Sequence, residues 1–215
     1  MGKAERRLAP CGVDVGVSGG FGMVCDQELV LADCPKGKPT PYQELEGSYK
    51  KLTAKDKAKP RYVDKTLRPR KAKVFDSLEM LELLNWAKTL AKERGYCGLF
   101  VVVEQPQLHI GKSHPSSYMV TGGCFHTWAY SLRSMGIKWG AVSPSHWKSG
   151  YKLTSDKLHS RSRLAELLPS AVGKRTVSDN KLVLDQHDVS EAVLLAMWLR
   201  DFCPQYLQDN YVPGN

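Results

Sequence analysis

The order of apolar and polar positions predicts a run of strands followed by alternating helices and strands. Three short apolar runs, separated by Gly/Ser and Asp/Gln turns, are typical of a β-meander. We expect its strands at about 11–17, 20–26 and 28–33. Further along, leucines recur at helical spacing, and a continuous apolar run is typical of a strand buried on both faces. The elements expected there are a helix at Ser77–Arg94, a strand at Leu99–Val103, a helix at Gly122–Met135, a strand at 138–143, and helices at Asp156–Leu168 and 188–202. This order predicts an α/β sandwich.

Residues 35–74 interrupt the pattern, since five prolines and many charges replace the apolar periodicity. Between Lys50 and Lys73, eleven Lys and Arg residues stand against two Asp residues, an excess equal to the whole net charge of +9. Such a concentration indicates a polyanion partner such as nucleic acid, with a solvated loop that keeps the protein in solution as the alternative. With 215 residues, we expect a single domain over 1–215 into which this basic arm is inserted.

The six cysteines are scattered without a CxxC pair, which argues against a structural zinc site and a disulfide framework. A reducing compartment is therefore expected. The basic first ten residues are too short and polar for a secretory signal. The compartment stays open between the cytoplasm of a bacterium or phage host and an organelle, chloroplast or mitochondrion, whose targeting segment is absent from this chain.

Asp14 stands in or at the end of the first predicted strand, directly before a glycine-rich turn. An unpaired charge inside a sheet is costly, so this carboxylate requires a partner. Asp14 and its glycines alone leave a metal cation and a phosphate equally open as that partner.

Three further acids stand at the ends of predicted elements. Glu104 ends the buried strand, and Asp188 and Glu191 begin the last helix at a spacing of i, i+3, which places both on one face. If the first and fourth strands are neighbours, all four acids meet at one edge of the sheet. Like charges so close raise one another's pKa unless divalent cations lie between them. Oxygen ligands without Cys or paired His indicate Mg²⁺ or Mn²⁺, and two such ions suit phosphodiester hydrolysis.

These acids also have ordinary structural interpretations. Asp188 and Glu191 match a capping box, in which the first residue caps the helix and the second reaches back. Glu104 could simply be the polar end of a strand. The joint occurrence of all four acids on these elements is more specific than any one of them.

Aromatic residues are expected mainly in the core. Trp128, Tyr130, Trp139 and Trp198 stand at helical or strand spacing. Phe21, Trp147 and Tyr151 stand beside the candidate functional turns, where either core packing or stacking on splayed bases is open.

In this order the motifs resemble those of the RuvC-type Holliday junction resolvases, with the closest likeness to the plant chloroplast branch. The resemblance covers most of the chain outside the basic arm. The motifs that carry it are Asp14-x-Gly16, Val101-Val102-Val103-Glu104-Gln105-Pro106, Thr121-Gly122-Gly123, Pro144-Ser145-His146-Trp147-Lys148, Asp156-Lys157-x-x-Ser160-Arg161, and Asp188-x-x-Glu191-Ala192. It implies an RNase H-like fold with a mixed central sheet, a homodimer, and symmetrical nicking of four-way DNA junctions that depends on Mg²⁺, with Mn²⁺ as a substitute and two ions in each active site.

The resemblance also implies roles for individual residues. The acidic metal-binding and catalytic tetrad corresponds to Asp14, Glu104, Asp188 and Glu191. The implied basic positions near the scissile phosphate are Lys148 and Lys157. Apart from the resemblance, further DNA contacts are expected from Arg161 and, within the basic arm, from Lys71 and Lys73. Gly122-Gly123 corresponds to a helix start along the junction backbone, where backbone N–H groups favour phosphate. Two residues depart from the family pattern. Glu191 stands where many members have Asp. For His187, two interpretations stay open, namely a metal ligand and a histidine outside the ligand set.

Two other function classes fit part of the pattern. An ATP-binding enzyme of the actin-like or sugar-kinase class also uses Asp-x-Gly, but it needs a second such loop and an adenosine-binding glycine pair, and neither is evident. A non-catalytic DNA-binding protein on a decayed nuclease core would have lost acids, whereas all four positions are acidic. A further alternative stays open, in which the protein is a general RNase H-like nuclease that acts on other branched DNA.

Overall fold

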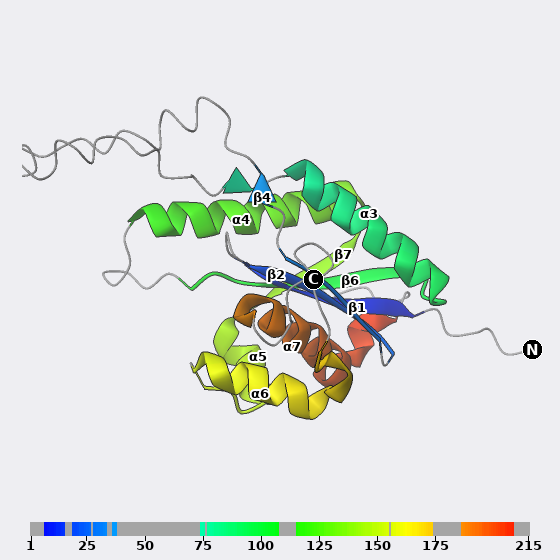
Figure 1. Ribbon diagram of the computed structural model, residues 1–215. Helices are drawn as coiled ribbons and strands as arrows, with labels where there is room; N and C mark the ends of the chain where they lie inside the picture. The colour runs from blue at the N-terminus through cyan, green and yellow to red at the C-terminus, as the bar shows by residue number, and fades with distance from the viewer. Residues whose placement is uncertain are drawn as a thin grey trace, which may run out of the picture.

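A central mixed sheet with helices on both faces makes up the described part of the molecule (Figure 1). The computed structural model describes residues 7–15, 19–26, 28–33, 36–37, 74–75, 77–107, 115–154, 156–173 and 186–208. One face is covered by α3 (Ser77–Glu93) and α4 (Pro115–Ser134), and the other by α5 (Pro144–Gly150), α6 (Lys157–Leu167) and α7 (His187–Phe202). Two 3₁₀ turns, Pro169–Ala171 and Pro204–Leu207, follow α6 and α7.

The sheet has the strand order β3-β2-β1-β6-β7. Its strands are β1 (Leu8–Asp14), β2 (Gly20–Cys25), β3 (Glu28–Asp33), β6 (Gly98–Glu104) and β7 (Lys138–Val142). The first three strands pair antiparallel, whereas β1, β6 and β7 run parallel. This confirms the predicted fold class, an α/β protein whose central mixed sheet opens with a β-meander and is flanked by helices.

A separate two-stranded ladder joins the two ends of the basic arm. It pairs β4 (Lys36–Gly37) with β5 (Val74–Phe75) in antiparallel register. The predicted arm, 35–74, therefore starts and ends side by side, and its positions 38–73 lie outside the described residues. The placement of the arm as an insertion in one domain stays a prediction.

The core consists of two apolar layers, one on each side of the sheet. Ala9, Cys11 and Val13 of β1 pack with buried residues of α3 and α4, and Leu8 packs with those of α7. The described cysteines form no disulfide, and no described helix has the length and apolarity that a membrane span requires.

Three glycines let helix α7 lie directly on the sheet. A Cβ at Gly12 would overlap the carbonyl oxygen of Ala192 and lie 2.7 Å from the nitrogen of Ala196. A Cβ at Gly20 or Gly22 would lie within 3 Å of the α7 backbone as well. Side chains at these positions would push the helix away from the sheet. Gly12, Gly20 and Gly22 therefore allow the start of α7 to lie close to the end of β1.

Most expected elements are confirmed within one or two residues, but two expected elements differ and one short helix was not predicted. β1 runs from Leu8 to Asp14 rather than from 11 to 17. α4 begins at Pro115, seven residues before Gly122, because proline is favourable in the first turn of a helix. Gly122 and Gly123 therefore lie inside α4. The short helix α5 was not predicted, since seven residues show too little periodicity.

Candidate active site

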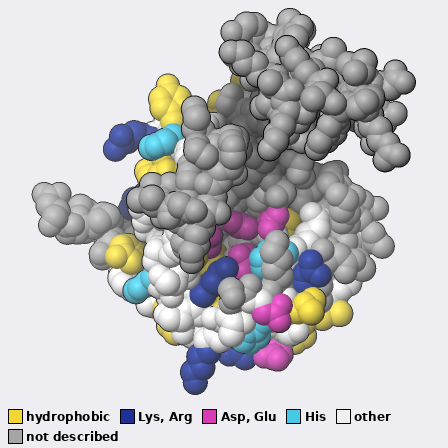
Figure 2. Space-filling model, turned by 90° about the vertical axis from the view of Figure 1, so that its left-hand side faces the viewer, with side chains coloured by type: hydrophobic (Ala, Val, Ile, Leu, Met, Phe, Trp, Pro, Cys, Tyr) yellow, Lys and Arg dark blue, Asp and Glu magenta, His cyan; other side chains and the backbone are white. Residues whose placement is uncertain are grey.

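The four predicted acids converge at one end of the sheet. Asp14 is the last residue of β1 and Glu104 the last residue of β6, and the parallel register aligns Val13 with Val103 just before them. Asp188 and Glu191 lie in the first turns of α7, which packs on β1. Figure 2 shows this end of the molecule, where acidic side chains gather in a hollow beside basic and histidine side chains. The sequence prediction that the acids share one site agrees with this arrangement.

The acids lie within one another's electrostatic field. Burial raises the pKa of Asp14 well above its usual value, and the charges of Glu104, Asp188 and Glu191 raise it further. The pKa of Glu104 is raised by burial and by Glu191 and Asp188. Lys148 opposes both shifts, because its positive charge favours the ionised carboxylates. The site thus concentrates negative charge that one lysine partly offsets.

Glu191 is the most enclosed of the four acids, with 5% of its surface exposed. Its Oε1 accepts a hydrogen bond from Ser160 Oγ at 2.9 Å and lies 2.7 Å from Lys148 Nζ. Its Oε2 lies 3.5 Å from His187 Nε2. The capping-box interpretation is wrong. The residue at the N-cap position of α7 is Gln186, which makes no side-chain hydrogen bond there. The Glu191 side chain contacts Lys148 of α5 and Ser160 of α6 instead.

Glu104 has a partner that the sequence did not predict. The indole Nε1 of Trp147, on α5, donates a hydrogen bond of 2.8 Å to Glu104 Oε2. Trp147, Phe21 and Tyr151 are all buried, so the alternative that they stack on splayed bases is wrong. Tyr130 is 76% exposed, and its expected place in the core is wrong as well, because its side chain faces outward from α4.

The expected DNA-binding residues fall into three groups. Lys148 stands beside the acids with 21% of its side chain exposed, and Lys157 and Arg161 lie on α6. Lys71 and Lys73 lie outside the described residues. Gly122 and Gly123 do not form a helix start, because N–H groups beyond the first turn of a helix are taken up by intrahelical hydrogen bonds. The predicted helix start at this pair is therefore wrong, and the DNA contact expected at Gly122 and Gly123 stays a prediction.

The donor chemistry of the site fits a hard divalent cation, since four carboxylates supply oxygen ligands and no cysteine is among them. Within the described ranges, no three His, Cys, Asp or Glu residues are arranged closely enough to hold one ion. Glu191 is instead paired with Lys148, and Glu104 is hydrogen-bonded to Trp147. In this arrangement the lysine ammonium supplies the positive charge next to the acids.

The metal-free protein is expected to lose stability as the pH rises. The pKa values of Asp14 and Glu104 are raised in the folded state, so folding favours their protonated forms. Their contribution is present below the ordinary carboxyl pKa, about 4, and is lost as the pH rises through the raised folded-state values. Thermal melting with a chelator from about pH 5 to pH 8 should show this loss in the wild type, and Mg²⁺ should reverse it. Asp14→Asn should flatten the profile, and an identical profile for both proteins would contradict the account.

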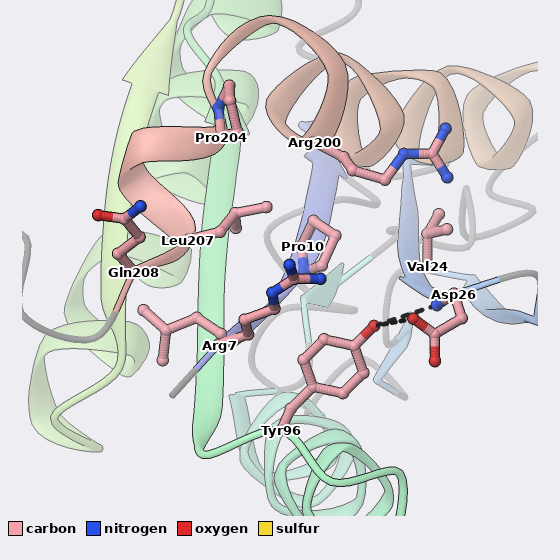
Figure 3. Close-up of a pocket in the computed structure, with 10 residues that line it drawn as sticks. Arg7, Pro10, Val24, Asp26, Tyr96, Arg200, Pro204, Leu207 and Gln208 are labelled. Atoms are coloured by element: carbon pink, nitrogen blue, oxygen red, sulfur yellow. Dashed lines mark hydrogen bonds between the residues drawn. The ribbon is translucent and has the colours of Figure 1, made fainter. Parts of the chain in front are cut away.

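A second hollow lies at the opposite end of β1 and is separate from the acids (Figure 3). Its volume is about 270 Å³, and it is lined partly by Arg7, Tyr96 and Arg200. Several of its polar groups are already paired. Tyr96 Oη donates to Asp26 Oδ1 at 3.0 Å, and Arg200 Nε donates to Asp201 Oδ1 at 2.7 Å. The acids therefore form the stronger candidate site.

Comparisons with known proteins give structural likenesses only. No protein-family model matches the chain, and no curated protein matches it. Thermus thermophilus RuvC in complex with a Holliday junction substrate has 11% identity and a TM-score of 0.47, over 91% of this chain and 96% of that one. Another structure of Thermus thermophilus RuvC has 10% identity and a TM-score of 0.47, over 94% and 98%. The yeast mitochondrial Holliday junction resolvase has 13% identity and a TM-score of 0.36, over 95% and 85%. These values describe distant likenesses of fold, and the chemistry of this chain depends on its own side chains.

Proposed function

We propose that this protein is a metal-dependent, structure-selective DNA endonuclease that resolves four-way junctions by symmetrical paired nicks. The observation that carries the proposal is the convergence of Asp14, Glu104, Asp188 and Glu191 from β1, β6 and α7. A cradle for a bare nucleotide phosphate is disfavoured, because four neighbouring carboxylates repel an anion. A helix cap is disfavoured as well, because the Glu191 side chain contacts Lys148, Ser160 and His187.

We propose that the four acids are the ligands of the metal, Mg²⁺ or Mn²⁺, with two ions in each site, and that they draw closer together than in this structure when the ions bind. Bound there, such ions would activate a water molecule and stabilise the leaving oxygen at a phosphodiester. The protein's own residues prepare the carboxylates. Ser160 donates to Glu191, and the partly exposed Lys148 offsets the acids while its side chain reaches solvent, from which a DNA phosphate approaches. Lys157 and Arg161 on α6 are proposed as further phosphate contacts.

Junction selectivity is proposed from the charge distribution and from the resemblance of the motifs. Contacts with phosphates position DNA but carry little sequence information, so the shape of a branched substrate should dominate recognition. Two strands must be cut symmetrically, and we therefore propose a homodimer with one acidic site in each subunit.

The function is tested with a mobile four-way junction whose arms are labelled separately, alongside a flap, a nicked duplex and a linear duplex of matched sequence. We expect paired nicks at symmetrical positions in the junction and slower cutting of the other DNAs. Preferential cutting of flaps or nicked duplexes would favour a general nuclease for branched DNA. Junction binding without cleavage in any divalent cation would favour a non-catalytic DNA-binding protein.

The basic arm is expected to supply much of the affinity for DNA. Neutralising Lys50, Lys51, Arg68, Arg70, Lys71 and Lys73 should weaken junction binding and reduce its salt dependence, because each lost phosphate contact lowers the slope of log K against log salt by about 0.9. Binding titrations at several salt concentrations measure both effects. A control with Lys88, Lys92 and Arg133 neutralised should retain the wild-type slope. Unchanged affinity of the arm variant at low and high salt would leave the arm only a role in solubility.

A further inference from the structure

We propose that Trp147 is a positioning residue that holds the Glu104 carboxylate in place for metal binding. The inference rests on the proposed function, because it concerns a ligand of the proposed metal site. It goes beyond that function by assigning a specific task to a core residue that carries no charge.

The hydrogen bond between these residues joins two elements of the site. Trp147 lies on α5 and is fully buried, and Glu104 ends β6, 43 positions earlier in the chain. The 2.8 Å bond runs from a neutral donor to a carboxylate, a class of hydrogen bond that is stronger than one between neutral groups. The hydrogen bond engages Oε2 of Glu104. The other oxygen of this carboxylate, Oε1, can then ligate an ion. Loss of the N–H would free the carboxylate to rotate.

A second buried tryptophan shows that a buried indole N–H in this core does not need an acid as its hydrogen-bond partner. Trp128, on α4, is also fully buried, and its ring is stacked on Phe21 with 6.2 Å between ring centroids. Its indole nitrogen has no hydrogen-bond partner among the described residues. Trp147 and Trp128 thus share residue type and burial but differ in contact with the acids. The pair provides a matched control.

Helix α5 contacts two of the acids with successive residues. Trp147 donates to Glu104, and Lys148 forms an ion pair of 2.7 Å with Glu191. Glu104 belongs to the sheet and Glu191 to α7, so α5 connects the acids of two separate elements. Such contacts behind a metal ligand orient it, and their loss typically weakens metal affinity or activity by about 10- to 100-fold.

The test compares Trp147→Phe with Trp128→Phe, since both keep an aromatic ring and remove an indole N–H. Mn²⁺ binding to the protein alone is measured by the electron paramagnetic resonance signal of the free ion. We expect Trp147→Phe to bind Mn²⁺ about tenfold or more weakly and Trp128→Phe to bind it like the wild type. In cleavage assays, Trp147→Phe should lower kcat at limiting Mg²⁺, recover it at high Mg²⁺, and leave KM for the junction unchanged.

Wild-type Mn²⁺ affinity in Trp147→Phe would overturn the inference and leave the proposed function standing. Failure of the wild type itself to bind Mn²⁺ would overturn the proposed function and this inference with it. If Trp147→Phe does not fold, nuclear magnetic resonance of the ¹⁵N-labelled wild type gives the same information. The indole N–H signal of Trp147, assigned by replacing the other four tryptophans singly, should shift on addition of Mg²⁺ while that of Trp128 does not. An unmoved Trp147 signal would overturn the inference.

Discussion

Replacing Asp14 by asparagine is expected to abolish junction cleavage while it stabilises the metal-free protein. The carboxylate ends β1 beside the other three acids, so its loss removes a proposed metal ligand. The rate of cleavage should fall by on the order of 10³-fold or more, as it does when a central member of a catalytic group is removed. Junction binding should be retained, because phosphate contacts come from lysines and arginines.

The gain in stability has an electrostatic cause. Asp14 is held near three other carboxylates, and burial and their charges raise its pKa. Asparagine has nearly the same shape without the charge, so the free energy of unfolding without metal should rise, and the Tm should rise with it. Sites that concentrate like charges for function commonly sacrifice stability in this way.

Both effects of Asp14→Asn are measured on one preparation, by single-turnover cleavage and by thermal melting with a chelator. Glu82→Gln is the control, since it removes an exposed acid of α3 and should change neither quantity. An Asp14→Asn protein that cuts as fast as the wild type, or that melts at a lower temperature without metal, would contradict the role assigned to Asp14.

The second large effect is expected at Gly12, where alanine should severely destabilise the protein. The added Cβ would overlap the carbonyl oxygen of Ala192 and approach the nitrogen of Ala196. Both atoms belong to the α7 backbone, which cannot rotate away as a side chain can. We expect a loss of about 3 kcal/mol or more, at the upper end of the range for overpacked cores.

Gly122→Ala provides the matched control for Gly12→Ala. A Cβ at Gly122 meets no atom within 4 Å, and the residue lies inside α4. Alanine there should raise stability by about 0.5–1 kcal/mol, because it restricts the unfolded chain and favours the helix. Chemical denaturation measures both variants. Wild-type stability of Gly12→Ala would contradict the close packing of α7 on β1.

The fold and the acidic residues could be predicted because their signals are local. Apolar periodicity marks each long helix, and the run Leu99–Val103 marks β6. Each of the four acids stands at the end or beginning of such an element, so their convergence followed once β1 and β6 were placed as neighbours.

The features that escaped prediction depend on contacts between distant parts of the chain. The glycines near Asp14 suggested a turn, but Gly12 is required by α7, about 180 positions later in the sequence. The pattern Asp188-x-x-Glu191 suggested a helix cap, but Ser160 and Lys148 engage Glu191 from α6 and α5. Gly122-Gly123 looked like a helix boundary, although α4 continues through it. The hydrogen bond from Trp147 to Glu104 has no local pattern at all.

The central claim is that the four converging acids form a metal-dependent site that cuts branched DNA. Its most direct test is single-turnover cleavage of a mobile four-way junction by the wild type with Mg²⁺ and with a chelator, beside Asp14→Asn and Glu104→Gln. The account predicts symmetrical paired nicks with Mg²⁺ in the wild type only. Absence of nicks in the wild type with Mg²⁺, or equal nicking by both variants, would contradict it.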